Sequence, residues 1–249
     1  MSSANVILLR PVLDNFHVDT QDCINHMKQW CKWYSDGKIT FSPNDYDDIF
    51  VSGSQIVHTS RNSLIEAALM HKGWTHCLFI DDDMVFPPET LDTLLNYDKP
   101  IVGVSYVGKA APFHLITFDL VDGEPTRWPQ TRGRNGAVKV FAVGMGVTLI
   151  KREVIEALKN PWFEFSKYKG EDIEFCGKAG ELGFETWVDT NLEVKHIGRH
   201  AFDIRFLENY NISADKWLAD QLKAGPNLNQ DEITKTREVV DTMFAGGGE

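Results

Sequence analysis

Three consecutive aspartates, Asp81, Asp82 and Asp83, directly follow the apolar run Cys77-Leu78-Phe79-Ile80. Such a run is typical of a buried strand, and ligands of open α/β sheets bind beyond the carboxyl ends of the strands. Adjacent carboxylates repel one another, and a divalent cation relieves that repulsion. Because hard carboxylate oxygens suit Mg²⁺ or Mn²⁺, the triplet is a candidate metal site that could hold a diphosphate. An exposed acidic turn is the simpler alternative for an isolated triplet.

The residues on either side of the triplet predict the framework that positions it. Capping candidates, Thr20 and Ser60, precede apolar residues at helical spacing, and Pro87-Pro88 suits the first turn of a helix. We therefore expect strands at 6–9, 49–51, 77–80 and 101–104, and helices at 21–34, 60–72 and 87–97. Strands that alternate with helices predict a parallel sheet covered by helices.

Beyond residue 105 the pattern changes. Strands are expected at 114–120 and 138–143 without a helix between them, which predicts a hairpin or a mixed-sheet insertion. The later elements predicted are strands at 147–150 and 185–188 and helices at 152–159, 171–183 and 231–244. No Pro-, Gly- or Ser-rich linker divides the chain, so we expect one domain over 1–249. It would comprise a nucleotide-binding half at 1–105, an acceptor half at 106–200 and a C-terminal extension at 201–249.

Several segments, taken in order, resemble motifs of the GT-A glycosyltransferases, especially the small stand-alone family-2-like enzymes of bacteria and phages. They are Ser60-Arg61-Asn62, Phe79 to Pro87, Ile101 to Tyr106, Gly144-Met145-Gly146, Gly170 to Phe175, and Val194-Lys195-His196-Ile197-Gly198. An Asp-x-Asp segment alone is a weak signal, whereas the ordered set is specific and covers more than half of the chain. The resemblance implies the GT-A fold, an α/β fold with a mostly parallel central sheet flanked by helices and a smaller mixed-sheet acceptor half.

The resemblance also implies a metal-dependent donor site. Asp83 corresponds to the metal ligand, and His196 to the late histidine that completes the metal shell in many of these enzymes. Asp81 corresponds to a residue that contacts the ribose or the donor sugar, and it is a further candidate ligand. A neutral imidazole binds Mn²⁺ well, although a single histidine is more often an ordinary surface or core residue. The implied cofactor is Mn²⁺ or Mg²⁺.

Glu171 and Asp172 are expected at the start of a helix, after a glycine. The helix dipole stabilises carboxylates there, so capping alone would explain the pair. In the resembling enzymes this pair faces the acceptor, which implies that Asp172 is the general base and Glu171 an acceptor contact. Adjacent helical residues point about 100° apart, so the two are not expected to share one role.

The same resemblance assigns further residues to the nucleotide-sugar donor. Arg61 and Asn62 correspond to a donor-binding pair, and the planar guanidinium of Arg61 suits diphosphate oxygens. The glycines of Gly144-Met145-Gly146 would let the backbone approach a sugar, although a flexible strand exit needs no such role. The remaining donor candidates are Pro11, Asp82 and Tyr106.

The composition is that of an ordinary globular protein, with 43% hydrophobic and 24% charged residues among 249. Because no run of about 18 apolar residues is present, we expect no stable membrane insertion and a cytoplasmic protein, in the host cytoplasm if it is phage-encoded. The four cysteines form no Cys-x-x-Cys pair and are expected to be reduced. A net charge of -11 disfavours broad binding to nucleic acids, although basic residues between Arg127 and Lys139 could form a local patch.

These observations predict a glycosyltransferase that moves a sugar from a nucleotide-diphosphate donor, with UDP as the first choice of nucleotide, to an acceptor hydroxyl. Direct displacement with Asp172 as base would invert the anomeric centre. The acceptor stays open between a glycan, a protein, a lipid and a hydroxymethylated DNA base, the last being the substrate of phage-type DNA glycosyltransferases. A nucleotidyltransferase would usually carry a Gly-rich loop where the first strand here ends in Arg10-Pro11. A non-catalytic sugar-nucleotide-binding module is the third alternative.

Residues 198–209 follow His196 and show no clean helical or strand period. If this segment closed over a bound diphosphate, Arg199, His200 and Arg205 would approach the negative charge and water would be excluded, as in many enzyme lids. An ordinary connector with two arginines is the alternative interpretation.

Overall fold

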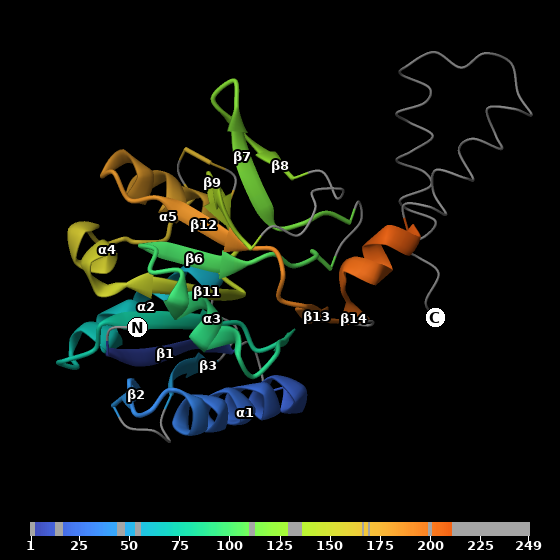
Figure 1. Cartoon of the computed structure of the whole chain (residues 1–249). Helices are drawn as coiled ribbons and strands as arrows, with labels where there is room; N and C mark the ends of the chain where they lie inside the picture. Colours follow the sequence, from blue (N-terminus) through green and yellow to red (C-terminus); the bar gives the residue numbers. More distant parts are fainter. Residues whose placement is uncertain are drawn as a thin grey trace, which may run out of the picture.

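The computed structural model describes residues 3–12, 17–43, 48–52, 56–109, 113–128, 136–165, 167–168, 170–198 and 201–210. Over this part of the chain, an eight-stranded mixed sheet forms the centre of the molecule (Figure 1). Its strands are β1 (Ala4–Val12), β2 (Ile39–Ser42), β3 (Ile49–Ser52), β4 (His76–Ile80), β6 (Ile101–Val104), β9 (Ala137–Val140), β11 (Val147–Lys151) and β12 (Thr186–Asp189).

The strand order places one reversed strand in the middle of the sheet. Neighbouring strands follow the order β2-β1-β4-β11-β6-β12-β9, and β3 pairs with the second half of β1. Strands β9 and β11 run antiparallel to the others, which are all parallel to one another. The carboxyl ends of β4 and β6 therefore lie at the same edge of the sheet. The expected α/β class, with a mostly parallel sheet, is confirmed.

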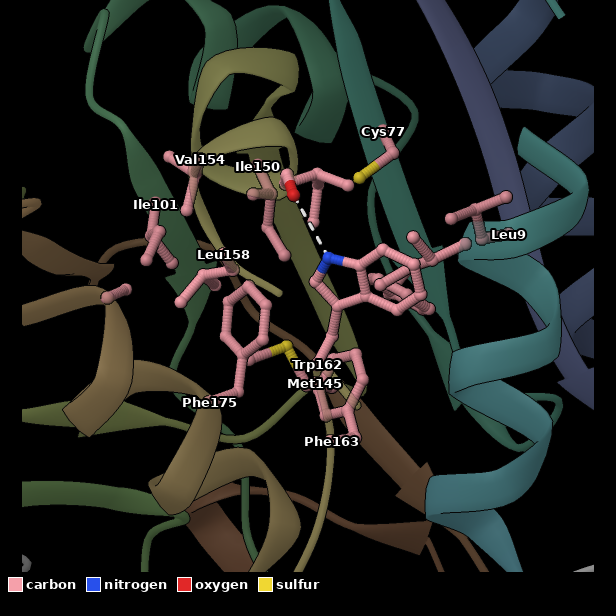
Figure 2. Close-up of a cluster of buried hydrophobic side chains, with 14 of the residues drawn as sticks. Leu9, Cys77, Ile101, Met145, Ile150, Val154, Leu158, Trp162, Phe163 and Phe175 are labelled. Atoms are coloured by element: carbon pink, nitrogen blue, oxygen red, sulfur yellow. Dashed lines mark hydrogen bonds between the residues drawn. The ribbon is translucent and has the colours of Figure 1, made fainter. Parts of the chain in front are cut away.

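Helices cover both faces of this sheet (Figure 1). One face packs against α1 (Val18–Tyr34) and α3 (Thr90–Asn96), and the other against α2 (Val57–Leu69), α4 (Arg152–Ala157) and α5 (Glu171–Glu181). Because successive strand residues point to opposite faces, Val6 and Leu8 of β1 join the first core, whereas Ile7 and Leu9 join the second. Figure 2 shows the second core, in which the indole N–H of Trp162 donates to the carbonyl of Ile155 at 2.9 Å.

Two small antiparallel sheets complete the described structure. One contains β7 (Thr117–Val121), β8 (Glu124–Arg127) and β10 (Ala142–Val143). The other contains β5 (Met84–Val85), β13 (Lys195–Ile197) and β14 (Ala201–Phe202). In the second sheet His196 pairs with Met84, and the N–H of Ile197 donates to the carbonyl of Asp83 at 2.7 Å. This pairing places His196 beside Asp83, the last residue of the acidic triplet.

Several expectations about local structure were wrong. Helix α1 begins at Val18 and α2 at Val57, so Thr20 and Ser60 lie inside the first turns and do not cap them. Thr20 instead donates its hydroxyl to the carbonyl of Asp82 at 2.9 Å. The strand expected at 138–143 is divided between two sheets, and β8 lies between the two expected strands, where none was predicted. The terminal helix expected at 231–244 lies outside the described residues.

In the segment after His196, the described residues 201–210 contain a short strand and a helical stretch. After β14, residues 204–210 are helical, and Phe202, Leu207 and Tyr210 are buried in a third hydrophobic cluster with Phe113. No helix in the described ranges is long and apolar enough to cross a membrane.

We expect Gly103 of β6 to be intolerant of even one added methyl group. A Cβ atom at this position would lie 2.5 Å from Oγ1 of Thr148 and 2.9 Å from a methyl group of Val143. Overpacking of this kind costs about 1–3 kcal/mol, so Gly103→Ala should lower the free energy of unfolding by that amount. Urea denaturation monitored by circular dichroism measures the change.

Gly180 in α5 provides the matched control. A Cβ atom there meets nothing within 4 Å, and alanine favours a helix over glycine by up to ~1 kcal/mol. Gly180→Ala should therefore leave the stability unchanged or raise it. Equal stability of the two variants would contradict the packing described for β6.

Candidate functional site

A cavity of about 530 Å³ opens at the edge of the sheet where β4 and β6 end. It brings together many of the residues singled out in the sequence, which come from α2, the end of β4, the segment after β6, the start of α5, and β13. The predicted residues in its lining are Arg61, Asp81, Asp83, Tyr106, Glu171, Asp172 and His196. Residues separated by more than a hundred positions thus face one space.

Arg61 connects the two sides of this cavity. Its buried guanidinium donates through Nη2 to both carboxylate oxygens of Asp81, at 2.9 and 3.1 Å, and through Nη1 to Oε1 of Glu171. Burial alone would lower the pKa of Arg61, but the charges of Asp81 and Glu171 outweigh it and raise this pKa. The two carboxylates balance the charge of Arg61, and they also tie the end of β4 to the start of α5.

Asp83 has a different set of partners. Its Oδ2 accepts a hydrogen bond from Nζ of Lys109, and its Oδ1 lies 3.2 Å from Nε2 of His196. Burial by itself would raise the pKa of Asp83, whereas His196 and Lys109 lower it, and the net shift is downward. Asp83 is therefore a charged carboxylate, held between two nitrogen-bearing side chains, at neutral pH.

The contacts of His196 bear on whether this histidine and Asp83 could hold a divalent cation. Nδ1 of His196 lies 3.0 Å from the carbonyl oxygen of Val107, which can only accept, so this nitrogen carries the proton. Nε2 of the same ring faces Oδ1 of Asp83 at 3.2 Å: in the protonated ring it donates to this oxygen, and in the neutral ring it presents a lone pair to it. Two acceptors that face one another need a proton or a cation between them. A histidine that donates its second N–H to a backbone carbonyl is typical of metal sites.

The protein ligands for such a cation would be few. Asp81, the third candidate, is occupied by the guanidinium of Arg61. No cluster of three or more His, Cys, Asp or Glu side chains that could hold a metal is present in the described ranges. A cation at Asp83 and His196 would therefore complete its shell with diphosphate oxygens and water, as Mg²⁺ commonly does.

Asp172 lines the cavity from the side of α5, as the second residue of that helix. Burial and the neighbouring charge of Glu171 raise its pKa to about 6, although Arg61 acts in the opposite direction. Its Oδ1 accepts a hydrogen bond from the N–H of Ile173 at 2.8 Å. Glu174, two positions after Asp172, accepts from the N–H groups of Lys167 and Tyr168 at 3.0 and 2.9 Å and so holds these residues of the preceding segment. A carboxylate with a pKa near neutrality suits a general base.

Tyr106 supports His196 and explains the two glycines near it. Its ring meets that of His196 edge-on, with centroids 5.3 Å apart, and its hydroxyl accepts from the N–H of Gly146 at 3.2 Å. A Cβ atom at Gly146 would lie 2.9 Å from Cζ of Tyr106, and one at Gly144 would meet the tyrosine hydroxyl more closely still. The close approach that these glycines allow is therefore to Tyr106. Any role for them toward a sugar stays a prediction.

Other predicted residues lie away from the cavity lining. Pro11 lies within β1, opposite Val51 of β3, because this strand extends beyond the 6–9 expected from the sequence. Asn62 exchanges hydrogen bonds with the backbone of Phe163, at 2.8 and 3.0 Å. The lining also excludes Asp82, Gly144, Gly146 and the fully buried Met145. Arg199 and His200 of the expected lid lie outside the described residues, and Arg205 is exposed on residues 204–210.

Sequence reasoning missed several residues of the cavity, namely Val57, Gly108, Lys109, His114 and Ile116. Arg127, which was noted only for a basic patch, also lines the cavity because β8 carries it there. The one available signal for Lys109 was its place, three residues after Tyr106 in the segment that follows the β6 strand.

Comparisons with known proteins bear on the fold. No model of a protein family matches the sequence, and no curated protein matches it. The crystal structure of A197 from STIV is similar over 78% of this chain and 86% of that chain, with a TM-score of 0.54 and 18% identity. The structure of the inositol-1-phosphate CTP transferase from T. maritima covers 79% of this chain, and 90% of its own length is matched, with a TM-score of 0.42 and 11% identity. The second similarity is too low to support an argument, and the first shows that this chain shares the fold of A197.

Proposed function

We propose that this protein is a metal-dependent glycosyltransferase of the GT-A type that uses a nucleotide-diphosphate sugar, with UDP as the first nucleotide to test. The observation that carries the proposal is the arrangement inside one cavity. A pair of residues that fits a divalent cation, Asp83 and His196, shares this space with Asp172, a carboxylate whose pKa is raised to about 6. The metal-dependent inverting transfer proposed here uses both features, one for the leaving group and one for the acceptor.

The donor would bind on the side of Asp83 and His196. A divalent cation bound there, Mn²⁺ or Mg²⁺, would neutralise the diphosphate leaving group. Lys109 and Arg127 line the same cavity and add positive charge for phosphate oxygens. Tyr106 keeps the ring of His196 in place from the side, because the two rings meet edge-on.

The acceptor would bind on the side of α5. Above pH 6 Asp172 is deprotonated and takes the proton of the acceptor hydroxyl, whose oxygen then bonds to the anomeric carbon as the bond to the diphosphate breaks. Displacement from the opposite face inverts the anomeric centre. Glu171 is held by Arg61 and fixes the start of α5, so it positions Asp172 whether or not it also contacts the acceptor. The acceptor class, whether glycan, protein, lipid or hydroxymethylated DNA base, stays open.

The two alternatives account for less of the cavity. A nucleotidyltransferase would be expected to carry a glycine-rich phosphate loop after its first strand, and the sequence has no glycine before Gly37. A non-catalytic sugar-nucleotide-binding module has no need of a carboxylate with a raised pKa at Asp172. Identification of the reaction products distinguishes both alternatives from the proposed glycosyltransferase.

Replacement of Asp83 tests the cation site. Asp83→Asn keeps the shape but removes the charge, so Mn²⁺-dependent binding of UDP should be abolished while the protein stays folded. Isothermal titration calorimetry with UDP, in Mn²⁺ and in EDTA, measures the loss. Asp98→Asn is the matched control, because Asp98 is an exposed aspartate paired with Lys151 at 2.6 Å outside the cavity. Unchanged Mn²⁺-dependent affinity in Asp83→Asn would refute the assignment.

Replacement of Asp172 separates chemistry from donor binding. Asp172→Asn should bind UDP and Mn²⁺ like the wild type, yet lose transfer by ~10²-fold or more, the usual contribution of a general base. In the wild type, kcat should rise with pH through about 6 as Asp172 loses its proton. Lost donor affinity with intact kcat would instead make Asp172 a donor ligand.

The stability of Asp172→Asn gives an independent check on the raised pKa. A folded-state pKa of about 6, above the ordinary value of 3.8, means that the charged carboxylate costs stability as the pH rises through this interval. The asparagine variant escapes this cost, so its Tm should exceed that of the wild type at pH 7.5. Near pH 3.5 both side chains are mostly neutral, and the difference should become small. A difference of the same size at both pH values would contradict the raised pKa.

A further inference from the structure

Lys109 lines the cavity and contacts Asp83, the carboxylate proposed to hold a divalent cation. Its Nζ donates to Oδ2 of Asp83, the carboxylate that also faces His196. The aliphatic part of the side chain passes close to the backbone of Gly198, where a Cβ atom would lie 3.1 Å from Cδ of Lys109. The lysine thus reaches Asp83 across the end of β13.

Lys109 differs from Arg61, the other cation closest to the aspartates. Arg61 is almost fully buried, and two carboxylates balance its charge. Lys109 has a side chain that is 37% exposed, and the only carboxylate it contacts among the described residues is Asp83. A lysine side chain carries a compact charge on a flexible four-carbon stem, so it can exchange one anionic partner for another at a low cost in free energy. Lys109 is therefore the movable positive charge at this end of the cavity.

A divalent cation at Asp83 and His196 would compete directly with Lys109. The ammonium group and the cation both need the oxygens of Asp83, and two positive charges at one carboxylate repel each other. A nucleoside diphosphate bound beside them offers the displaced ammonium group a new anionic partner, because Lys109 lines the same cavity.

We propose that Lys109 is an exchangeable cation that pairs with Asp83 when no ligand is bound and moves to the diphosphate when a divalent cation and the nucleotide bind together. This inference rests on the proposed function, since it assigns the diphosphate of the donor as the second partner. Its consequence is that the binding of the divalent cation and the binding of the nucleotide are coupled. Lys109 weakens the binding of the cation alone and strengthens the binding of the nucleotide once the cation is present, so each ligand promotes the other to the same degree.

Calorimetric titrations of Lys109→Met test both halves of the exchange. Without nucleotide, Mn²⁺ should bind about ten-fold more tightly than to the wild type, because the competing charge is gone. With saturating Mn²⁺, UDP should bind about ten-fold more weakly, the usual loss for a hydrogen bond to a charged group. Lys109→Arg, which keeps the charge, should lie near the wild type in both titrations.

Two further variants control for net charge and for folding. Lys139→Met removes the same charge from an exposed pair with Glu185, at 2.7 Å and outside the cavity, and it should change neither affinity. Lys109→Gln keeps a polar side chain and serves in place of the methionine variant should that variant not fold, as judged by circular dichroism.

Opposite shifts in the two titrations support the exchange. Unchanged or weaker Mn²⁺ binding in Lys109→Met, with Asp83→Asn unable to bind Mn²⁺, would overturn it and leave the proposed function intact. Unchanged UDP affinity would likewise overturn it. If the wild type bound UDP equally well in EDTA and only Lys109→Met needed Mn²⁺, the lysine would replace the metal, and the metal dependence of the proposed function would fail together with the exchange. The absence of UDP binding in every variant, with or without Mn²⁺, would refute the proposed function itself.

Discussion

The buried guanidinium of Arg61, shared between Asp81 and Glu171, is the contact on which the geometry of the cavity depends. A buried charge is tolerated only when it is paired, and the loss of one partner of such a pair typically costs about 3–5 kcal/mol. Asp81 belongs to the end of β4 and Glu171 to the first residue of α5, so the contact fixes one element relative to the other. The two residues proposed to act, Asp83 and Asp172, are each close in sequence to one of these anchors. Their relative position follows from a contact in which neither takes part.

A second constraint is the short pairing between β5 and β13. These strands have two and three residues, yet their register carries His196 to Asp83, and the N–H of Ile197 binds the carbonyl of the same aspartate. Tyr106 packs against His196 and fills the space that Gly144 and Gly146 leave. Contacts between backbone segments therefore hold Asp83 and His196 in place, whereas Lys109 reaches Asp83 through a flexible side chain. This division separates a rigid part of the site from a movable one.

Much of the framework could be predicted from the sequence, because the apolar run before Asp81, the spacing of apolar residues in α1 and α2 and the ordered motifs are local signals. The parts that could not be predicted depend on contacts between distant segments. Strands β5, β13 and β14 are too short to have a period of their own, and their pairing alone defines them. Arg61 was assigned to the diphosphate because its chemistry suits phosphate, and only the fold reveals that two carboxylates already hold it. Nothing in the sequence around Lys109 indicates that it pairs with Asp83.

The products released from a panel of UDP-, GDP- and CDP-sugars, assayed in Mn²⁺ and in EDTA, test the central claim most directly. A glycosyltransferase breaks the bond between the sugar and the diphosphate. The account therefore predicts that one donor yields a nucleoside diphosphate, in the presence of acceptor or by slow hydrolysis without it, and only when Mn²⁺ is present. The release of a nucleoside monophosphate, or of pyrophosphate when nucleoside triphosphates replace the sugars, would contradict the account and identify nucleotidyl chemistry. The absence of any release from every donor would leave the protein a binding module.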